Sequence, residues 1–521
     1  MNTTQFLRLL QDGLENSSQL TPDKAVAVVE GNVHSYSELQ NNSSCLANAL
    51  VERGLKPGQR VAIYMDNTWP CIVSIFAILQ AGGVFLVINP QTKADKLQYM
   101  LTDCAATVLL SDAHLEMVFG DIIDHCDDLH HLIYSGKELN NPSYRIPIEK
   151  FDSVIASTSP LKTTVKPIPG DLCALIYTSG STGNPKGVMH THQSMVFAVG
   201  SLIEYLRLSA QDRILNVLPM AFDYGLYQLL MSTWLGATLI LERSFTYPAM
   251  IYKRIKEQQI TVFPGVPTIY AMLAASHRKK PLQFPSVTRV TNTAAALSSS
   301  SVPALAEIFP NALIYKMYGL TECKRVCYLE PELINSHADS VGKAIPGTET
   351  FLLTSTGERI HGSGEGILHV RGPHIMAGYW NQPELSADMI KSGDFAGDRV
   401  LCTHDWFRMD EEGFLYFVGR RDDIIKSRGE KVSPVEVESA LLLIPGVIES
   451  AVFGVADEVL GQAIVAYVSV EDKALTGLKI KKLVTAKLEN FMVPKEVIVL
   501  ESLPKSTNGK IDKKALMGLS L

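Results

Sequence analysis

The stretch LCALIYTSGSTGNPKG (172–187) joins an apolar run to a polar loop, and it determines how the rest of the chain is interpreted. Its first residues are apolar or β-branched, as in a strand that helices cover on both faces. The loop YTSGSTGNPKG (177–187) then holds four Ser/Thr hydroxyls, three glycines and one lysine within eleven residues. Backbone N–H groups, hydroxyls and an ammonium can surround phosphate oxygens, and glycine lets the backbone approach the anion. The spacing is not that of a Walker A loop, so we predict a phosphate-binding loop of another kind.

Similar apolar runs alternate with helical stretches through most of the first 400 residues. The stretch YSELQNNSSCLANALVERG (36–54), for example, predicts a helix that ends at a glycine. Alternation of strands and helices predicts an α/β fold with largely parallel sheets. The predicted strands are RVAIYM (60–65), GVFLVI (83–88), ATVLLS (106–111), LCALIYT (172–178), RILNVLP (213–219), ATLILE (237–242) and ITVFPG (260–265).

The pattern changes in the last third of the chain. Gly, Glu and turn residues crowd the segment 347–380, which predicts short antiparallel strands in a small β-barrel-like part. Further on, VSPVEVESALLLIPG (432–446) predicts a capped helix, and LKIKKLVTAKLENFMVP (478–494) predicts an amphipathic helix ended by its proline. These elements indicate a separate small α+β unit.

We place the domain boundary at the charged segment GRRDD (419–423). Residues 1–420 are expected to form a large N-terminal domain of stacked α/β subdomains with the β-barrel-like part. Residues 421–521 are expected to form a small C-terminal domain. A boundary made of charged rather than apolar residues indicates a joint that moves.

Composition excludes several classes of protein. The net charge of −7 leaves no broad basic field for nucleic acid or an anionic membrane. Eight cysteines stand singly, without a CxxC pair, which predicts reduced thiols. The N-terminus has no secretory signal pattern, and the most apolar region (70–90) is interrupted by polar residues and glycines, so we expect no membrane span. These features predict a cytoplasmic protein whose partner is a small molecule or a compact protein surface.

With the phosphate-loop segment, seven further motifs in sequence order resemble those of the adenylate-forming superfamily. This superfamily contains acyl-CoA synthetases, luciferases and the adenylation domains of non-ribosomal peptide synthetases. The resemblance extends over nearly the whole chain. The motifs are HSYSEL (34–39), QAGGVFLVINP (80–90), LPMAFDYG (218–225), MYGLTE (317–322), GEGILHVRGPHIMAGYW (364–380), DEEGFLYFVGRRDDIIKSRGEKVSPVEVE (410–438) and LPKSTNGKIDKKAL (503–516).

The resemblance implies an ATP site. Joining a carboxylate to the α-phosphorus of ATP brings two anions together, so it requires Mg²⁺ and a cradle rich in cations or N–H groups. Tyr318 offers a ring for adenine, Thr321 a hydroxyl for the phosphate and Glu322 a carboxylate for Mg²⁺, and Gly319 is a further implied nucleotide contact. The loop residues implied to contact ATP are Thr178, Ser179, Gly180, Ser181, Thr182, Gly183 and Lys186.

Two further nucleotide contacts are implied nearer the domain boundary. Asp405 matches the aspartate that accepts hydrogen bonds from both ribose hydroxyls. His404 stands where the family usually has glycine, which bears on the backbone of the turn but not on the carboxylate. Arg420 matches the arginine that reaches the ribose and phosphate.

The resemblance also implies that the small domain rotates between two half-reactions. Asp422 matches the hinge, and Gly429 matches the strand that faces a thiol tunnel after rotation. Lys510 follows a glycine turn, which suits a mobile tip that delivers one positive charge to the carboxylate and α-phosphate. The implied catalytic residues are Thr182, Lys186, Glu322 and Lys510.

The residues expected to line the acyl pocket leave the substrate open. Asp223 matches the aspartate that holds the substrate ammonium in amino-acid-activating relatives. Lys324 or its neighbour Arg325 could instead neutralise Asp223 or bind an acidic substrate. The pocket residues are Phe222, Asp223, Tyr224, Gly265, Val266, Ala294, Ala295, Met317, Cys323 and Lys324.

The predicted activity is that of an AMP-forming acid–thiol ligase that uses ATP and Mg²⁺. The acceptor is CoA or the phosphopantetheine of a separate carrier protein, because motifs typical of both kinds of relative occur. A luciferase-like oxygenase and an adenylate-only ligase are alternatives within the superfamily. A stand-alone amino-acid-activating enzyme and a catalytically silent nucleotide-binding module also remain open.

Overall fold

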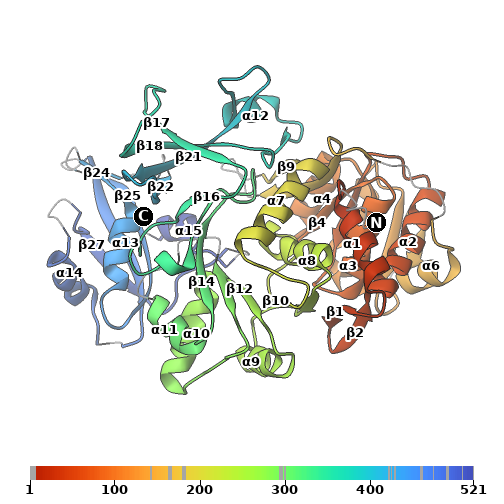
Figure 1. Cartoon of the computed structure of the whole chain (residues 1–521), viewed down its shortest axis with the longest axis horizontal. Coiled ribbons are helices and arrows are strands. Elements are labelled where there is room, and N and C mark those ends of the chain that lie inside the picture. Colours follow the sequence, from red (N-terminus) through yellow and green to blue (C-terminus); the bar gives the residue numbers. More distant parts are fainter. Residues whose placement is uncertain are drawn as a thin grey trace, which may run out of the picture.

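In a computed structural model, the protein consists of a large N-terminal part and a small C-terminal part (Figure 1). The N-terminal part contains stacked sheets and helices, and the C-terminal elements lie together at the other end of the chain. The structure describes residues 7–140, 143–161, 167–178, 184–292, 297, 301–420, 423, 425–427, 430–457, 461–472, 474–488, 492–506 and 509–519.

The first sheet contains the strand that precedes the predicted phosphate loop. Its central strands pair in parallel, as the apolar runs predicted. Antiparallel pairs occur where the loop turns the chain back and at the neighbouring edge. In order across the sheet the strands are β19 (Gly378–Tyr379), β9 (Lys186–Thr191), β8 (Leu172–Thr178), β4 (Val84–Ile88), β3 (Arg60–Tyr64), β5 (Ala106–Asp112), β6 (His131–Ser135) and β7 (Ile148–Lys150).

The second sheet is also largely parallel, with antiparallel strands at both edges. Every strand that we predicted from an apolar run therefore lies in one of these two sheets. In order its strands are β16 (Lys343–Ala344), β15 (Cys327–Leu329), β14 (Leu313–Tyr318), β13 (Arg289–Asn292), β12 (Val262–Gly265), β10 (Arg213–Asn216), β11 (Thr238–Leu241), β1 (Ala25–Val29) and β2 (Asn32–Ser35).

Helices fill the space between the two sheets and cover their outer faces. Side chains from both sheets and from the helices between them form one buried core, which explains why these strands are apolar on both sides. The helices of this layer are α1 (Leu10–Leu20), α2 (Tyr36–Glu52), α3 (Trp69–Gln80), α7 (His192–Tyr205) and α8 (Asp223–Leu235). The outer helices are α4 (Ala94–Asp103), α5 (Glu116–Phe119), α9 (Pro248–Glu257), α10 (Pro267–Lys279) and α11 (Val302–Ile308). Helix α6 (Phe151–Ser157) packs near α2.

A third, antiparallel sheet confirms the change of pattern in the last third of the chain. Buried side chains of this sheet form a small separate core, which also includes residues of the loop that follows β14. Its elements are β17 (Glu349–Leu353), β18 (Gly364–Arg371), β20 (Ile390–Ser392), β21 (Arg399–Met409), β22 (Leu415–Arg420) and the neighbouring helix α12 (Pro383–Met389).

The C-terminal part is a fourth sheet with helices packed on it. The capped helix was predicted correctly, because the Ser433 hydroxyl accepts from the N–H of Glu436 at 3.3 Å. The second helix is shorter than predicted, since it ends at Thr485 rather than near Pro494. The elements are β23 (Ile425–Ser427), β24 (Glu430–Val432), α13 (Pro434–Leu442), β25 (Val447–Asp457), β26 (Gly461–Val470), α14 (Gly477–Thr485), β27 (Glu496–Leu500) and α15 (Lys513–Met517).

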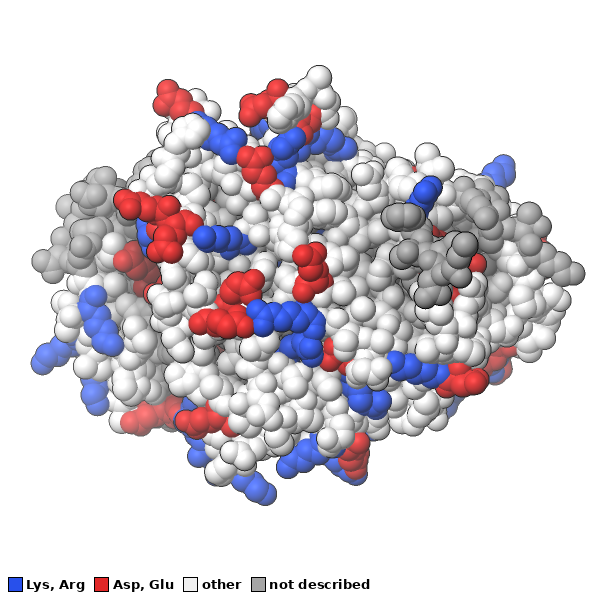
Figure 2. Space-filling model, in the orientation of Figure 1, with Lys and Arg blue, Asp and Glu red and all other residues white. Residues whose placement is uncertain are grey.

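Several composition-based predictions agree with the structure. All eight cysteines are buried thiols. Figure 2 shows lysines and arginines interspersed with acidic residues on the viewed face, without a broad basic field. Among the described helices, none has the length and apolar character needed to cross a membrane.

Candidate functional site

The predicted phosphate loop turns the chain from β8 back into β9. Thr178 and Lys186 are partners in this antiparallel register, so the chain leaves and re-enters the sheet at neighbouring positions. The Thr178 hydroxyl is buried and has no hydrogen-bond partner within the described part of the chain, which leaves it able to donate to an anion. Of the residues predicted in this loop, Ser179, Gly180, Ser181, Thr182 and Gly183 lie outside the described residues.

Lys186 belongs to a network with Tyr379 and Glu322. Its Nζ donates to the Tyr379 hydroxyl at 2.9 Å and lies 4.2 Å from the centre of that ring. The Tyr379 hydroxyl donates to Glu322 Oε1 at 2.6 Å, and Lys186 Nζ lies 3.8 Å from the same oxygen. Burial, with the charge of Glu322, raises the pKa of Tyr379, so its hydroxyl keeps its proton. The hydroxyl thus links an ammonium to a carboxylate.

Tyr318 and Asp405 meet although they come from different sheets. The Tyr318 hydroxyl donates to Asp405, and the Tyr318 ring packs edge-on against Phe407 at a centroid distance of 4.8 Å. Arg420 is the register partner of Asp405 on the neighbouring strand, and its Nε lies 3.8 Å from Asp405 Oδ1. Burial raises the pKa of the Asp405 carboxyl. The structure therefore brings together the three residues that we predicted for adenine and ribose.

His404 adopts the left-handed backbone conformation, with φ +58°. Glycine adopts this conformation without a steric penalty, which accounts for the glycine that the resemblance implies here. His404 lies within strand β21, where the register with β18 shifts, and the neighbouring N–H of Asp405 donates to the Thr403 hydroxyl at 3.1 Å. The His404 ring also lies 3.2 Å from the Asp388 carboxylate. The substitution therefore leaves the Asp405 carboxylate at the site.

The loop after β14 folds tightly back on itself. The N–H of Val326 donates to the carbonyl of Tyr318 at 3.0 Å. A Cβ added at Gly319 would lie 2.5 Å from the carbonyl oxygen of Lys324, so this close approach requires glycine. Lys324 itself has φ +64°, an uncommon conformation for a residue with a side chain. Side chains on the two sides of this turn can therefore face different parts of the site.

On the acyl side, Lys324 is paired with Asp223. Its Nζ donates to Asp223 Oδ2 at 3.0 Å and lies 4.3 Å from the ring centre of Tyr227 and 5.5 Å from that of Tyr224. Burial lowers the pKa of Lys324 to about 7, and the charge of Asp223 opposes this shift. His190 lies beside this pair, and burial lowers its pKa to about 4, so its ring is neutral. Of the arrangements left open by the sequence, the structure pairs Lys324 with Asp223; burial would raise the pKa of this carboxyl, but the charges of Lys324 and Arg325 together lower it.

The other predicted acyl-site residues surround the start of α8 and the ends of β12 and β14. Phe222 is half-buried immediately before α8. Gly265 is tightly enclosed, because a Cβ there would lie 2.7 Å from the ring of Tyr270. Ala294 and Ala295 lie outside the described residues. The buried members are Tyr224, Gly265, Val266, Met317 and Cys323.

Lys510 comes from the C-terminal part and reaches the N-terminal part. It closes a turn in which the N–H of Ser506 donates to the carbonyl of Lys510 at 2.7 Å. Gly509 has φ +73°, and a Cβ added to it would lie 3.5 Å from the hydroxyl of Thr268. Thr268 belongs to α10, so the tip of this turn contacts the N-terminal part.

The ammonium of Lys510 interacts with charged groups from the whole site. Lys510 is exposed as a residue, yet the protein atoms around its ammonium displace water and lower the pKa of Lys510, and the charge of Arg420 adds to this shift. The carboxylates of Asp223, Asp405 and Glu322 oppose it. These carboxylates come from the predicted acyl, ribose and metal positions. The charges at all three positions therefore act on the same ammonium.

The two remaining predicted positions, Asp422 and Gly429, lie outside the described residues. The described residues do include one ion pair between the two parts, in which Arg278 Nη2 lies 3.4 Å from Glu471 Oε2. Both side chains are exposed, so this pair contributes little to stability. It is therefore compatible with a joint that moves.

Sequence reasoning missed Tyr379, Tyr227 and His190. Tyr379 is the second-last residue of a segment that we recognised as a motif, but nothing in that segment distinguishes its hydroxyl from that of a core tyrosine. Tyr227 follows Asp223 by one helical turn, a spacing that places both on one face of α8. That spacing was a usable signal, whereas the contacts of Tyr379 and His190 arise only when distant segments meet.

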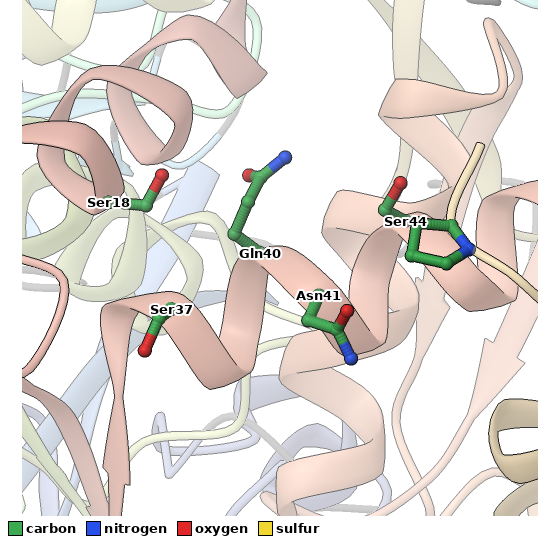
Figure 3. A pocket seen from close by; sticks show the side chains of 6 residues that line it. Ser18, Ser37, Gln40, Asn41 and Ser44 are labelled. Atoms are coloured by element: carbon green, nitrogen blue, oxygen red, sulfur yellow. The ribbon is translucent and has the colours of Figure 1, made fainter. Parts of the chain in front are cut away.

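A polar hollow lies away from these residues, between α1 and α2 (Figure 3). Serine, glutamine and asparagine side chains face it, and none of the candidate site residues is among those that line it. The lining residues are Ser18, Ser37, Gln40, Asn41, Ser44 and Pro160.

Two family models match the chain. The model described as AMP-binding enzyme matches residues 14–380, and the model described as AMP-binding enzyme C-terminal domain matches residues 436–510. The matched ranges include all of the candidate site residues except Asp405, Arg420, Asp422 and Gly429.

Curated relatives fall into two groups. The chain is 30% identical over 514 residues to tyrocidine synthase 3 of Brevibacillus parabrevis, covering 98% of this chain and 8% of that protein. It therefore spans less than a tenth of the length of that relative. It is 29% identical over 537 residues to a long-chain-fatty-acid–CoA ligase of Escherichia coli O157:H7, covering 97% of this chain and 94% of that protein.

Solved structures share the fold over the whole chain. ATP-bound MatB from Rhodopseudomonas palustris has a TM-score of 0.85 at 25% identity, with 98% of each chain covered. The anthranilate CoA ligase AuaEII in complex with anthranoyl-AMP has a TM-score of 0.91 at 24% identity, with 100% of this chain and 99% of that chain covered.

Proposed function

The chain belongs to the AMP-binding enzyme family, and on that premise we propose that it activates a carboxylic acid as an acyl-adenylate and transfers the acyl group to a thiol. In the first half-reaction a carboxylate oxygen attacks the α-phosphorus of ATP, and the bond to pyrophosphate breaks. In the second, a thiolate attacks the acyl carbon and AMP leaves. The thiol is that of CoA or of a carrier-bound phosphopantetheine.

The observation that carries this proposal is the convergence on Lys510. The charges of Asp223, Asp405 and Glu322 in the N-terminal part all raise the pKa of the Lys510 ammonium, and the turn that carries Lys510 lies against Thr268 of that part. An ammonium at this place can stabilise the negative charge that develops between the substrate carboxylate and the α-phosphate. We propose that this arrangement is the one used for the first half-reaction.

The other described residues have complementary roles in this proposal. Asp405 accepts hydrogen bonds from the ribose, and Tyr318, held by Asp405, lies against adenine. Lys186 and Thr178 contact phosphate oxygens. Each of these roles uses a donor or acceptor that the chain already orients at the site.

The residues present also fit a magnesium ion. Glu322 supplies a carboxylate oxygen, the ligand type that Mg²⁺ prefers, and Tyr379 orients that carboxylate through its 2.6 Å hydrogen bond. Glu322 would hold the ion, which, when bound, neutralises phosphate charge. In this proposal, Tyr379 orients the Glu322 carboxylate and prevents it from pairing directly with Lys186.

We further propose that residues 1–420 and 421–521 are the units that move between the half-reactions. Asp422 would be the hinge, and Gly429 would face the thiol tunnel after the rotation. The exposed ion pair between Arg278 and Glu471 supports this division, because breaking it costs little. Location in the cytoplasm stays a prediction.

Lys510→Ala tests the proposal. We expect ATP–pyrophosphate exchange with a carboxylic-acid panel to fall by about 10²-fold or more, the usual effect of removing a transition-state donor. Thioester formation from supplied acyl-adenylate should change little, because Lys510 leaves the site in the second step. CoA and a phosphopantetheine-bearing carrier are offered in parallel to identify the acceptor.

The matched control is Lys505→Ala, which removes a lysine of the same segment that pairs with Glu449 at 2.8 Å instead. This variant should retain both half-reactions. An equal loss of both half-reactions in Lys510→Ala would contradict the assigned role. If no acid supports exchange in the unmodified enzyme, the ligase proposal itself fails.

A further inference from the structure

The ammonium of Lys324 lies in surroundings suited to a cation. It is 3.0 Å from the carboxylate of Asp223, and the rings of Tyr227 and Tyr224 face it at 4.3 and 5.5 Å. The Lys324 side chain is only 2% exposed, so little water competes with these groups. A carboxylate and two aromatic faces would hold any ammonium group at this place. The chain fills this cation site with its own side chain.

The backbone adopts an unfavourable conformation to bring Lys324 there. Its φ of +64° lies in the region that residues with a Cβ avoid. The same turn presses the Lys324 carbonyl against Gly319, where even a methyl group would clash. Strain of this kind persists only where the surrounding structure supports it, and it is concentrated at functional sites.

The pair also lies close to the reacting groups. Glu322, which we propose for Mg²⁺, lies in the same tight turn as Lys324, and the charges of Asp223 and Glu322 both act on the Lys510 ammonium. An acid that carries an ammonium group next to its carboxylate would therefore place that group near Asp223. There it would meet the positive charges of Lys324 and of the buried Arg325, which already act on the Asp223 carboxylate.

From this geometry we propose that Lys324 determines substrate selectivity by occupying the Asp223 carboxylate, so that the enzyme activates acids that lack a neighbouring ammonium group. Lys324 takes the position that the ammonium of an amino acid would need. This inference rests on the proposed acid-activating function and narrows its substrate class. Lys324 therefore distinguishes this chain from an amino-acid-activating enzyme, although Asp223 matches the aspartate that such enzymes have.

The test compares acids that differ only by an amino group. Hydrocinnamic acid is paired with phenylalanine, and isocaproic acid with leucine, and kcat/KM for ATP–pyrophosphate exchange is measured with each. We expect the unmodified enzyme to prefer the amino-free member of at least one pair. Lys324→Met keeps the length of the side chain and removes its charge, so the ratio should shift toward the amino acid by about tenfold or more.

Lys324→Met leaves Asp223 without its paired cation and could therefore misfold, so a double variant serves as a second test. Asp223→Asn combined with Lys324→Met removes both charges of this pair together, so that neither is left buried without the other. It should lose discrimination without favouring the amino acid, because no carboxylate remains to bind the ammonium. Circular dichroism and thermal melting establish that each variant is folded.

The outcomes are distinct. A preference of the unmodified enzyme for the amino acids would overturn the inference and leave the ligase function intact. So would a selectivity ratio that is the same in the unmodified enzyme, in folded Lys324→Met and in the double variant. An absence of exchange with every acid would instead refute the proposed function on which the inference rests.

Discussion

Replacing Tyr379 by phenylalanine removes one oxygen atom from the centre of the Lys186–Tyr379–Glu322 network. In the native network this hydroxyl donates to Glu322 Oε1 at 2.6 Å and accepts from Lys186 Nζ at 2.9 Å. Both are hydrogen bonds to charged groups, which contribute about 1.5–3 kcal/mol each. The ring stays in place, because the side chain is buried and phenylalanine keeps its shape.

Without the hydroxyl, Glu322 and Lys186 face each other directly. They are already 3.8 Å apart, and at an effective dielectric constant of about 20 their attraction is about 4 kcal/mol. We expect the carboxylate to turn toward the ammonium, which withdraws Glu322 from Mg²⁺ and Lys186 from phosphate. A loss of about 1.5–3 kcal/mol corresponds to a decrease of about 10- to 150-fold in kcat/KM.

The assay is ATP–pyrophosphate exchange over a range of Mg²⁺ concentrations. Tyr379→Phe should lower the rate and raise the Mg²⁺ concentration needed for half-maximal activity, while thioester formation from supplied acyl-adenylate changes little. The matched control is Tyr134→Phe, which removes a similar hydroxyl that donates to Glu138 Oε2 at 2.7 Å. Tyr134 lies on β6, toward the opposite edge of the first sheet from β9 and β19, which hold Lys186 and Tyr379. An unaltered Mg²⁺ dependence, or an equal effect of the control substitution, would refute the reasoning.

Other predictions concern the ribose position, the left-handed backbone at His404 and the response to acid. Asp405→Asn should raise the KM for ATP in the exchange assay by about tenfold, because a charged acceptor is replaced by a neutral one; an unaltered KM would remove Asp405 from the ribose site. His404→Gly should alter the free energy of unfolding, measured in urea, by less than about 1 kcal/mol, whereas His404→Val should cost more, because a β-branched residue tolerates φ +58° poorly. Burial lowers the pKa of His190, His192 and His374 to about 4, so the folded state binds fewer protons than the unfolded state. Stability should therefore be fully present above about pH 6.5 and fall as the pH drops toward 4, by up to about 3 kcal/mol for each histidine; His192→Asn should flatten this dependence in acid titrations followed by circular dichroism.

Much of the architecture could be predicted because its causes are local. Runs such as 60–65 and 83–88 are apolar on both sides, since helices cover both faces of their sheet. The Ser433 cap acts within one helical turn and is therefore visible in the sequence. The end of α14 was misjudged, because the amphipathic pattern continues past Thr485 and a helix ends where its packing ends.

The candidate site divides in the same way. The sequence by itself determined which residue types are present for phosphate, ribose and metal, since each lies within a short motif. Only the tertiary structure decided how they are connected. Tyr379 joins Lys186 across 193 positions and Glu322 across 57, and Lys324 reaches Asp223 across 101. Contacts at such separations depend on how sheets and loops pack, and no periodicity in the chain encodes them. Only the folded protein therefore shows that the Asp223 carboxylate pairs with Lys324.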